Sequence, residues 1–137
     1  QAFLKHSLPL LFPAISYSFY PVYCGLYDID YRTLPLAEDF TLNIKDYNIP
    51  NGGIILPNPN APSSVLLALD QIEQLCQNSS SVVIIDEAYI DFASDASMVK
   101  ELDNYPNLVI LQTLSKAWGM AGIRLGIGLL DLLGVCL

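Results

Sequence analysis

The chain has 137 residues, 53% of them hydrophobic, and fourteen Asp and Glu against six Lys and Arg give a net charge of −8. This length allows one domain with a hydrophobic core, and the acidic balance argues against a nucleic-acid partner, which needs a basic surface. No apolar run reaches the roughly 18 residues of a membrane-spanning helix. The mean hydropathy of +0.41 predicts that part of the surface packs against something else, or that the chain is a piece of a larger protein.

Strands and helices alternate along the sequence. We expect a strand at 10–12, a helical turn at 17–24, a loop with one short strand at 38–51, a strand at 54–56, a helix at 65–76 capped by Ser63 and Ser64, a strand at 82–85, a short helix at 96–102, and strands at 108–112 and 125–130. The predicted strands are continuously apolar, which is typical of a parallel sheet covered on both faces. The sequence therefore predicts an α/β fold, a three-layer sandwich with a mostly parallel sheet.

Three polar clusters follow predicted strands, at residues 58–60, 86–89 and 113–116. In open parallel sheets, ligands bind at the carboxyl ends of the strands. We expect these clusters to meet in one crevice at that edge of the sheet.

Lys116 is the most informative residue of the third cluster. It follows the buried strand at 108–112, with Thr113 and Ser115 before it and Arg124 beyond it. A lysine held near apolar groups can attack a carbonyl and form a Schiff base. Two hydroxyls and a guanidinium suit a phosphate group, although the hydroxyls could equally cap a turn while the arginine reaches solvent.

Asp86 comes directly after the apolar run at 82–85. A carboxylate held there suits a task that needs fixed negative charge, such as pairing with a protonated ring nitrogen. Apolar residues followed by Asp-Glu also occur in nucleotide hydrolases, but that function requires a phosphate loop, and the sequence contains none. A solvated carboxylate at a strand end remains the alternative.

Three tyrosines are further candidates for the crevice. The phenol of Tyr89, three residues after Asp86, could hydrogen-bond a ligand oxygen. Tyr17 or Tyr20 could stack on a flat ligand ring. Core packing is the alternative for each of them.

The remaining chemistry-bearing residues favour structural roles. His6 is the only histidine, lacks a carboxylate nearby in sequence and is expected at the surface. Cys24, Cys76 and Cys136 are widely spaced and odd in number, so we expect buried free thiols, no metal site and a reducing, cytoplasmic setting. The chain lacks an initiator Met, and the apolar stretch at 8–14 is followed by no convincing signal-peptide cleavage site.

Three blocks together resemble the fold-type I pyridoxal-phosphate aminotransferases, and within that family they are most similar to the histidinol-phosphate aminotransferases. The blocks are residues 58–64, 86–92 and 113–126, and the aromatic stretch at 17–20 adds support. The similarity implies amino transfer between histidinol phosphate and 2-oxoglutarate, with pyridoxal 5′-phosphate as cofactor. It also implies a small-molecule amino donor, a 2-oxo acid and a homodimer in the full-length protein.

The resemblance assigns a role to each candidate. Lys116 would hold the cofactor as a Schiff base and carry a proton between the substrate and the cofactor, while Asp86 would pair with the pyridinium nitrogen. The other roles it implies are a hydrogen bond to the phenolic oxygen from Tyr89, the phosphate site from Thr113, Ser115 and Arg124, ring stacking from Tyr17, a cofactor contact from Asn60 and a substrate contact from Tyr20.

The sequence also departs from this family. Ala61 stands where relatives usually have Asn before Pro, so it stays open whether Asn60 replaces that contact. We expect residues 1–128 to be part of the cofactor-binding large domain and residues 129–137 to be a divergent tail. Relatives are roughly three times as long, so the isolated chain is expected to be inactive. Another fold-type I enzyme, such as an aromatic aminotransferase or a phosphothreonine decarboxylase, and a non-catalytic remnant are the alternatives.

Overall fold

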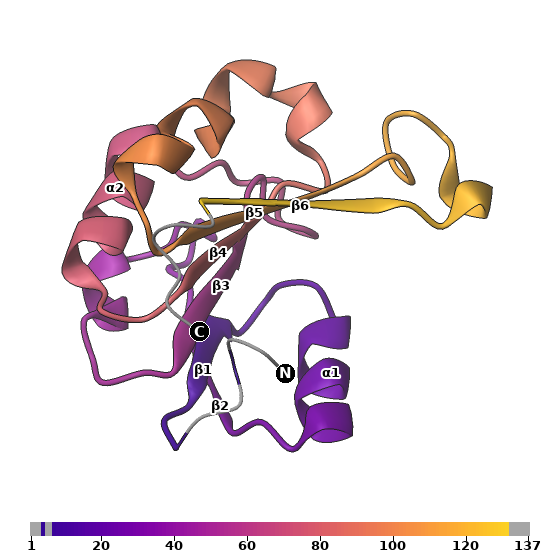
Figure 1. The fold of residues 1–137 in the computed structure, drawn as a ribbon. Coiled ribbons are helices and arrows are strands. Elements are labelled where there is room, and N and C mark those ends of the chain that lie inside the picture. The colour runs from indigo at the N-terminus through magenta and orange to yellow at the C-terminus, as the bar shows by residue number, and fades with distance from the viewer. Residues whose placement is uncertain (1–3, 5–6, 132–137) are drawn as a thin grey trace.

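The computed structural model describes residue 4 and residues 7–131, and these fold around one mixed sheet (Figure 1). In that part of the chain the sheet has six strands in the order β2-β1-β3-β4-β5-β6, and all neighbours are parallel except β5 and β6. The strands are β1 (Leu10–Pro13), β2 (Tyr31–Leu34), β3 (Gly53–Pro57), β4 (Val83–Asp86), β5 (Leu108–Thr113) and β6 (Gly126–Leu130).

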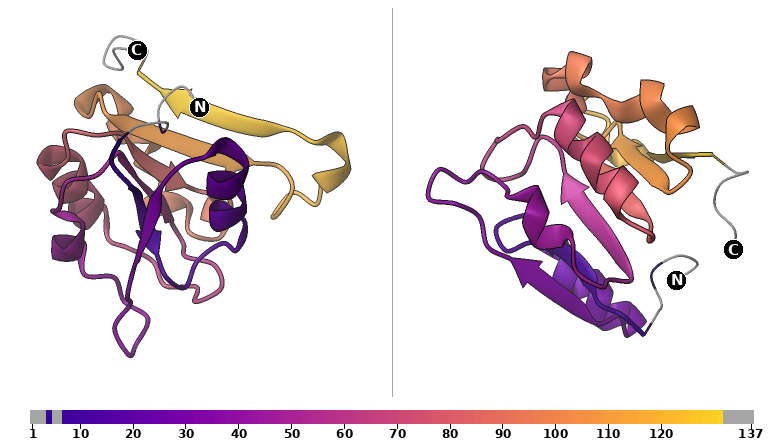
Figure 2. Two further views of the ribbon diagram at one scale, coloured as in Figure 1. Left: turned by 90° about the horizontal axis from the view of Figure 1, so that it is seen from below. Right: turned by 90° about the vertical axis from the view of Figure 1, so that its left-hand side faces the viewer.

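Helical segments cover both faces of the sheet. The two α-helices are α1 (Phe19–Tyr27) and α2 (Leu69–Asn78), and the 3₁₀ segments are η1 (Ile44–Tyr47), η2 (Ile90–Phe92), η3 (Ser94–Ala96), η4 (Met98–Asn104) and η5 (Ala121–Ile123). Figures 1 and 2 show α1 on one side of the sheet and α2 on the other. The predicted α/β class with a mostly parallel sheet is confirmed.

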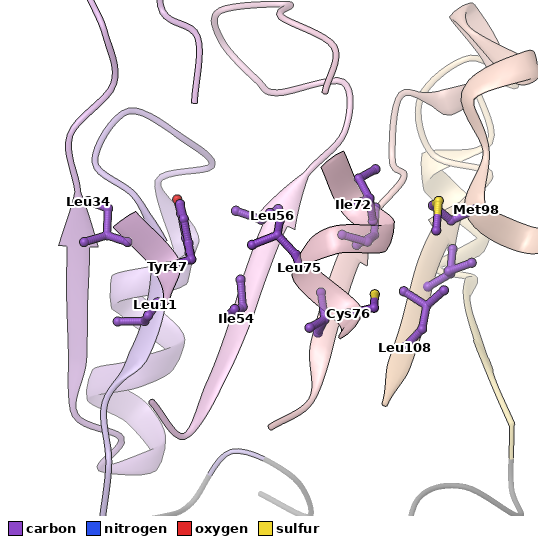
Figure 3. Packing of buried hydrophobic residues seen from close by; sticks show 13 residues of the cluster. Leu11, Leu34, Tyr47, Ile54, Leu56, Ile72, Leu75, Cys76, Met98 and Leu108 are labelled. Carbon is purple, nitrogen blue, oxygen red and sulfur yellow. The ribbon is translucent and has the colours of Figure 1, made fainter. Parts of the chain in front are cut away.

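Two apolar clusters explain why the strands read as continuous apolar runs. Ile54 and Leu56 of β3 belong to the cluster under α2, whereas Ile55 belongs to the cluster under α1. Successive side chains of a strand point to opposite faces, so both faces of a covered sheet must be apolar. Figure 3 shows the first cluster, in which Ile72 and Leu75 of α2 lie against the strands.

The helix predicted at 65–76 begins later than expected, because α2 starts at Leu69 after the N-cap Ala68. Hydrogen bonds hold the preceding residues in a loop. Asn58 Oδ1 accepts from the Leu67 N–H at 2.8 Å, and the Asn60 N–H donates to the Val65 carbonyl at 2.8 Å. The expected cap of Ser63 and Ser64 is therefore wrong, and Ser64 instead adopts a left-handed backbone with φ of 60°.

Two further differences concern the edges of the fold. Strand β2 was not predicted, because its sequence YRTL is polar and its first three residues are exposed at the sheet edge. The helix expected at 96–102 consists of the 3₁₀ segments η3 and η4. Strand β6 ends at Leu130, which is also the last residue of the strand expected at 125–130.

Other predictions concern burial and membrane association. Cys24 and Cys76 are buried free thiols as expected, whereas His6 and Cys136 lie outside the described residues. Within the described part of the chain, no helix has the length and apolar character needed to cross a membrane.

Candidate functional site

The carboxyl ends of β3, β4 and β5 lie side by side. Pro57 pairs with Asp86, and Asp86 pairs with Leu111. A cavity of about 310 Å³ opens at this edge, large enough for a small cofactor. Its lining residues are Tyr17, Pro57, Ala61, Asp86, Ala88, Tyr89, Leu111, Gln112, Thr113, Ser115, Lys116 and Arg124.

Two of the three predicted polar clusters meet in this cavity, together with Tyr17 and Arg124. The remaining predicted cluster, at residues 58–60, does not line this cavity. Ala61 lines the cavity, whereas Asn60 lines two neighbouring cavities. Asn60 Nδ2 donates to the Ile15 carbonyl at 3.0 Å and to Ser63 Oγ at 2.8 Å, so Asn60 joins the loop after β3 to the residues after β1.

Asp86 is the last residue of β4, and both of its carboxylate oxygens are engaged. Oδ1 accepts from the Ala88 N–H at 3.1 Å, and Oδ2 accepts from the Tyr20 hydroxyl at 2.7 Å. The side chain is half-buried and lines the cavity. A carboxylate offers about four acceptor positions, so these two bonds leave capacity for a donor in the cavity.

Tyr20 lies behind Asp86 and is not among the residues that line the cavity. The sequence predicted a substrate contact, but the side chain is only 5% exposed and its hydroxyl is bonded to Asp86. Burial, and then the neighbouring Asp86 charge, raise the pKa of the Tyr20 hydroxyl well above its ordinary value. Tyr20 therefore remains a neutral donor across the physiological range.

Lys116 lies in the turn after β5, opposite Tyr89. Its Nζ is 5.4 Å from the centre of the Tyr89 ring, within the range of a cation–π contact. The side chain of Lys116 is exposed, so the apolar surroundings expected from the sequence are not formed by the described residues alone. An exposed amine at the mouth of the cavity is accessible to a carbonyl compound.

The hydroxyls predicted for a phosphate site lie next to each other. Thr113 Oγ1 accepts from the Ser115 N–H at 3.1 Å, and the two hydroxyl oxygens are 3.0 Å apart. Arg124 follows η5 with a left-handed φ of 54°, and its Nη1 lies 3.4 Å from the Ala121 carbonyl. The three residues, which carry hydroxyl and guanidinium donors, line the same cavity.

The loop that carries these donors is exposed and is tied to the loop after β4. Trp118 Nε1 donates to Asp91 Oδ1 at 3.1 Å. Figure 1 shows the connection between β5 and β6 reaching beyond the rest of the sheet. Trp118, Met120 and Ile123 on this connection are large apolar side chains left exposed.

Sequence reasoning missed the role of Glu87. It is 1% exposed, and its carboxylate accepts from Ser97 Oγ, the Met98 N–H and Gln112 Nε2, each at 2.8 Å. These bonds fix Gln112, another residue of the cavity wall, and tie the 3₁₀ segments to β5. The signal in the sequence was an acidic residue next to an apolar run, but its donors lie 10 to 25 residues away.

Comparison with known proteins gives a consistent family. The family model described as "Aminotransferase class I and II" matches residues 1–132. Histidinol-phosphate aminotransferase 1 of Hydrogenovibrio crunogenus is 57% identical over 129 residues, which are 93% of this chain and 36% of that protein. Histidinol-phosphate aminotransferase of Pseudomonas syringae is 56% identical over 93% of this chain and 36% of its own length. The chain thus spans about a third of these relatives.

Solved structures agree with this similarity. The histidinol-phosphate aminotransferase from Clostridium acetobutylicum superposes with a TM-score of 0.86 at 27% identity, over 90% of this chain and 39% of that one. The enzyme from Sinorhizobium meliloti, solved in complex with pyridoxal-5′-phosphate, gives a TM-score of 0.77 at 25% identity, over 90% and 36% of the two chains.

Proposed function

Because this chain belongs to the aminotransferase class I and II family, we propose that it supplies the cofactor-binding part of a pyridoxal-phosphate-dependent transaminase acting on histidinol phosphate and 2-oxoglutarate. The single observation that carries the proposal is the joint presence of Asp86, Tyr89 and Lys116 around one cavity. The 54–57% identity to proteins named histidinol-phosphate aminotransferase supports the choice of amino donor. An aromatic aminotransferase and a phosphothreonine decarboxylase are the alternatives within the same fold type.

The residues around the cavity fit pyridoxal phosphate chemically. Asp86 is an acceptor for a protonated ring nitrogen, and the Tyr89 phenol is a donor for the ring oxygen. Thr113, Ser115 and Arg124 offer donors for a phosphate. The edge of the sheet at which they lie is the usual ligand-binding edge of a parallel sheet.

When bound, the cofactor supplies an electron sink for carbanion chemistry at the substrate Cα. Asp86 would hold the ring nitrogen protonated, and Tyr17, which is exposed beside the cavity, would stack on the ring. Lys116 would hold the cofactor covalently through its amine and move a proton at the substrate Cα. Ala61 and not Asn60 lines this cavity, so a cofactor contact of Asn60 is not part of the proposal.

The full-length protein is proposed to be a cytoplasmic homodimer. Exposed apolar side chains next to the cavity support the proposal that a second protein surface packs against this region. They are Trp118, Met120 and Ile123. Lys116 is exposed in the described chain, and a second surface over it would exclude water from the reacting groups.

Covalent capture of the cofactor tests the proposal. The purified chain is mixed with pyridoxal phosphate, its visible absorbance is recorded, and the adduct is reduced with borohydride and mapped by peptide analysis. A new band with the label on Lys116 supports the proposed site. Label spread over Lys45 and Lys100, without a distinct band, would show that the chain is a non-catalytic remnant with the motif but no working site.

Substrate assignment needs a second measurement. The chain, and the longest natural polypeptide that carries it, are incubated with histidinol phosphate and 2-oxoglutarate, and glutamate is measured. An aromatic amino acid replaces histidinol phosphate in the matched reaction. Glutamate formed only from histidinol phosphate supports the proposed donor, and glutamate formed only from the aromatic amino acid contradicts it.

A further inference from the structure

A hydrogen bond between Tyr20 and Asp86 links α1 to the candidate site. The Tyr20 hydroxyl donates to Asp86 Oδ2 at 2.7 Å across 66 residues of sequence. A hydroxyl-to-carboxylate bond of this length is in the range of charge-assisted hydrogen bonds. Tyr20 is buried and absent from the cavity wall, so its hydroxyl reaches the site only through Asp86.

The Tyr20 ring is held on two sides by other aromatic rings. Phe12 of β1 packs against it edge-on at 5.6 Å between centroids, with an interplanar angle of 66°. Tyr17 packs against it at 5.6 Å and 82°. The first of these partners belongs to the sheet core, and the second lines the cavity. Packing therefore holds the ring that carries the hydroxyl in one position.

The Asp86 carboxylate is consequently fixed through both oxygens. The Ala88 N–H holds Oδ1, and the Tyr20 hydroxyl holds Oδ2. Two donors at the two oxygens set the rotation of the carboxylate plane, which a single bond would leave free. A preorganised carboxylate interacts more strongly with a cationic partner than one that must reorient on binding.

We propose that Tyr20 is a positioning residue of this site: its hydroxyl orients the Asp86 carboxylate toward the ring nitrogen of the bound cofactor, and its ring supports Tyr17 beside the ring face. The inference rests on the proposed function for the identity of the ring. Tyr20 acts through these two residues and touches neither cofactor nor substrate.

A purely structural role is the competing explanation, because a buried hydroxyl needs an acceptor wherever it lies. Phenylalanine would fill the same space and keep both ring contacts. The hydroxyl alone thus distinguishes positioning from packing, and Tyr20→Phe is the decisive change. Tyr23→Phe is the matched control, since it removes a hydroxyl from the same helix at a side chain that is 48% exposed.

The experiment compares the chain, Tyr20→Phe and Tyr23→Phe in three measurements. The first is the thermal unfolding temperature. The second, made without cofactor, is the conformation of the Asp86 side chain in a crystal structure of each protein. The third is the dissociation constant of pyridoxal phosphate and the pH dependence of its visible band.

We expect Tyr20→Phe to leave Asp86 in more than one orientation and to weaken cofactor binding by on the order of tenfold, the effect of one lost hydrogen bond to a charged group. The pH dependence of the band should shift in Tyr20→Phe and stay constant in Tyr23→Phe. An unchanged Asp86 conformation, or unchanged affinity and band, would overturn the inference. If the unmodified chain captures no cofactor, the proposed function fails, and the Asp86 conformation still decides whether Tyr20 positions it.

A second variant covers the case in which Tyr20→Phe does not fold. Incorporation of 3-fluorotyrosine at position 20 keeps the ring and the hydroxyl but makes the phenol a stronger donor. The pH dependence of the cofactor band should then shift, and the orientation of the Asp86 carboxylate in the cofactor-free crystal should change. The unfolding temperature should be retained. A response in neither measurement contradicts the positioning role.

Discussion

The Lys116 ammonium lies 5.4 Å from the centre of the Tyr89 ring. The two residues come from different loops, one after β5 and one after β4, and both line the same cavity. The contact places the candidate nucleophile beside the candidate donor to the ring oxygen. Since a cation–π contact at an exposed site stabilises by only about 0.5–1 kcal/mol, a covalent bond at Nζ can replace it at little cost.

Replacing Lys116 tests the covalent role. Lys116→Ala should abolish borohydride-fixed labelling by pyridoxal phosphate, and in the complete enzyme nearly all turnover, because no other amine lines this cavity in the described chain. Lys100→Ala, at an exposed lysine of η4, is the control and should label as the unmodified chain does. Undiminished labelling of Lys116→Ala would rule out Lys116 as the attachment point.

Asp86→Asn tests the charge at the ring nitrogen. The amide keeps an oxygen for the Ala88 N–H or the Tyr20 hydroxyl, so the fold should be retained. Turnover of the complete enzyme should fall by about a hundredfold or more, because a neutral side chain no longer holds the ring nitrogen protonated. Cofactor affinity and turnover are measured together, and turnover equal to that of the unmodified protein would show that the assigned role of Asp86 is wrong.

The convergence of residues 86–89 and 113–116 followed from the sequence, because apolar strands of a parallel sheet end at the same edge. The start of α2 did not follow, since hydrogen bonds from Asn58 to Leu67 override the helical spacing of the apolar residues. Strand β2 could not be predicted from the sequence, because an exposed edge strand carries no apolar pattern. The bond between Tyr20 and Asp86 joins residues 66 positions apart, and only the packing of α1 on the sheet brings them together.

Glu87 provides a test of stability near the site. Glu87→Ala should lower the free energy of unfolding by about 2 to 4 kcal/mol, because three donors lose their acceptor and a small cavity is left. Gln112→Ala and the double substitution complete a cycle whose coupling energy isolates the bond between the two side chains. Urea denaturation measures all four proteins, and strictly additive losses would contradict a direct interaction.

Gly53→Ala tests a backbone constraint at the start of β3. Gly53 has φ of +151°, and an added Cβ would lie 2.8 Å from Leu4 Cδ2 and 3.2 Å from Val82 Cγ1. Strain and crowding should lower the free energy of unfolding by about 2 kcal/mol. Gly25→Ala in α1 is the control, because a Cβ there meets nothing within 4 Å and alanine favours helix by roughly 0.5–1 kcal/mol. Equal effects of the two substitutions would refute the constraint.

The buried thiol of Cys76 predicts how stability depends on alkaline pH. Burial, and then the charge of Glu73, raise the pKa of Cys76 from 9.0 to about 12. The unfolded chain therefore loses this proton at a lower pH than the folded chain does. Below pH 9 the contribution to stability is complete, and it is lost as the pH rises from about 9 to about 12. The buried hydroxyls of Tyr20 and Tyr47, whose pKa values are also raised, add to the loss above pH 10.

Cys76→Ala separates the thiol from the tyrosines. Its free energy of unfolding should be lower than that of the unmodified chain at pH 7, through lost packing, but should fall less steeply between pH 9 and 11. Urea denaturation at a series of pH values measures both slopes. Parallel pH profiles for the unmodified chain and Cys76→Ala would mean that the thiol is as acidic in the folded chain as in the unfolded one, and that its burial has no part in the alkaline loss of stability.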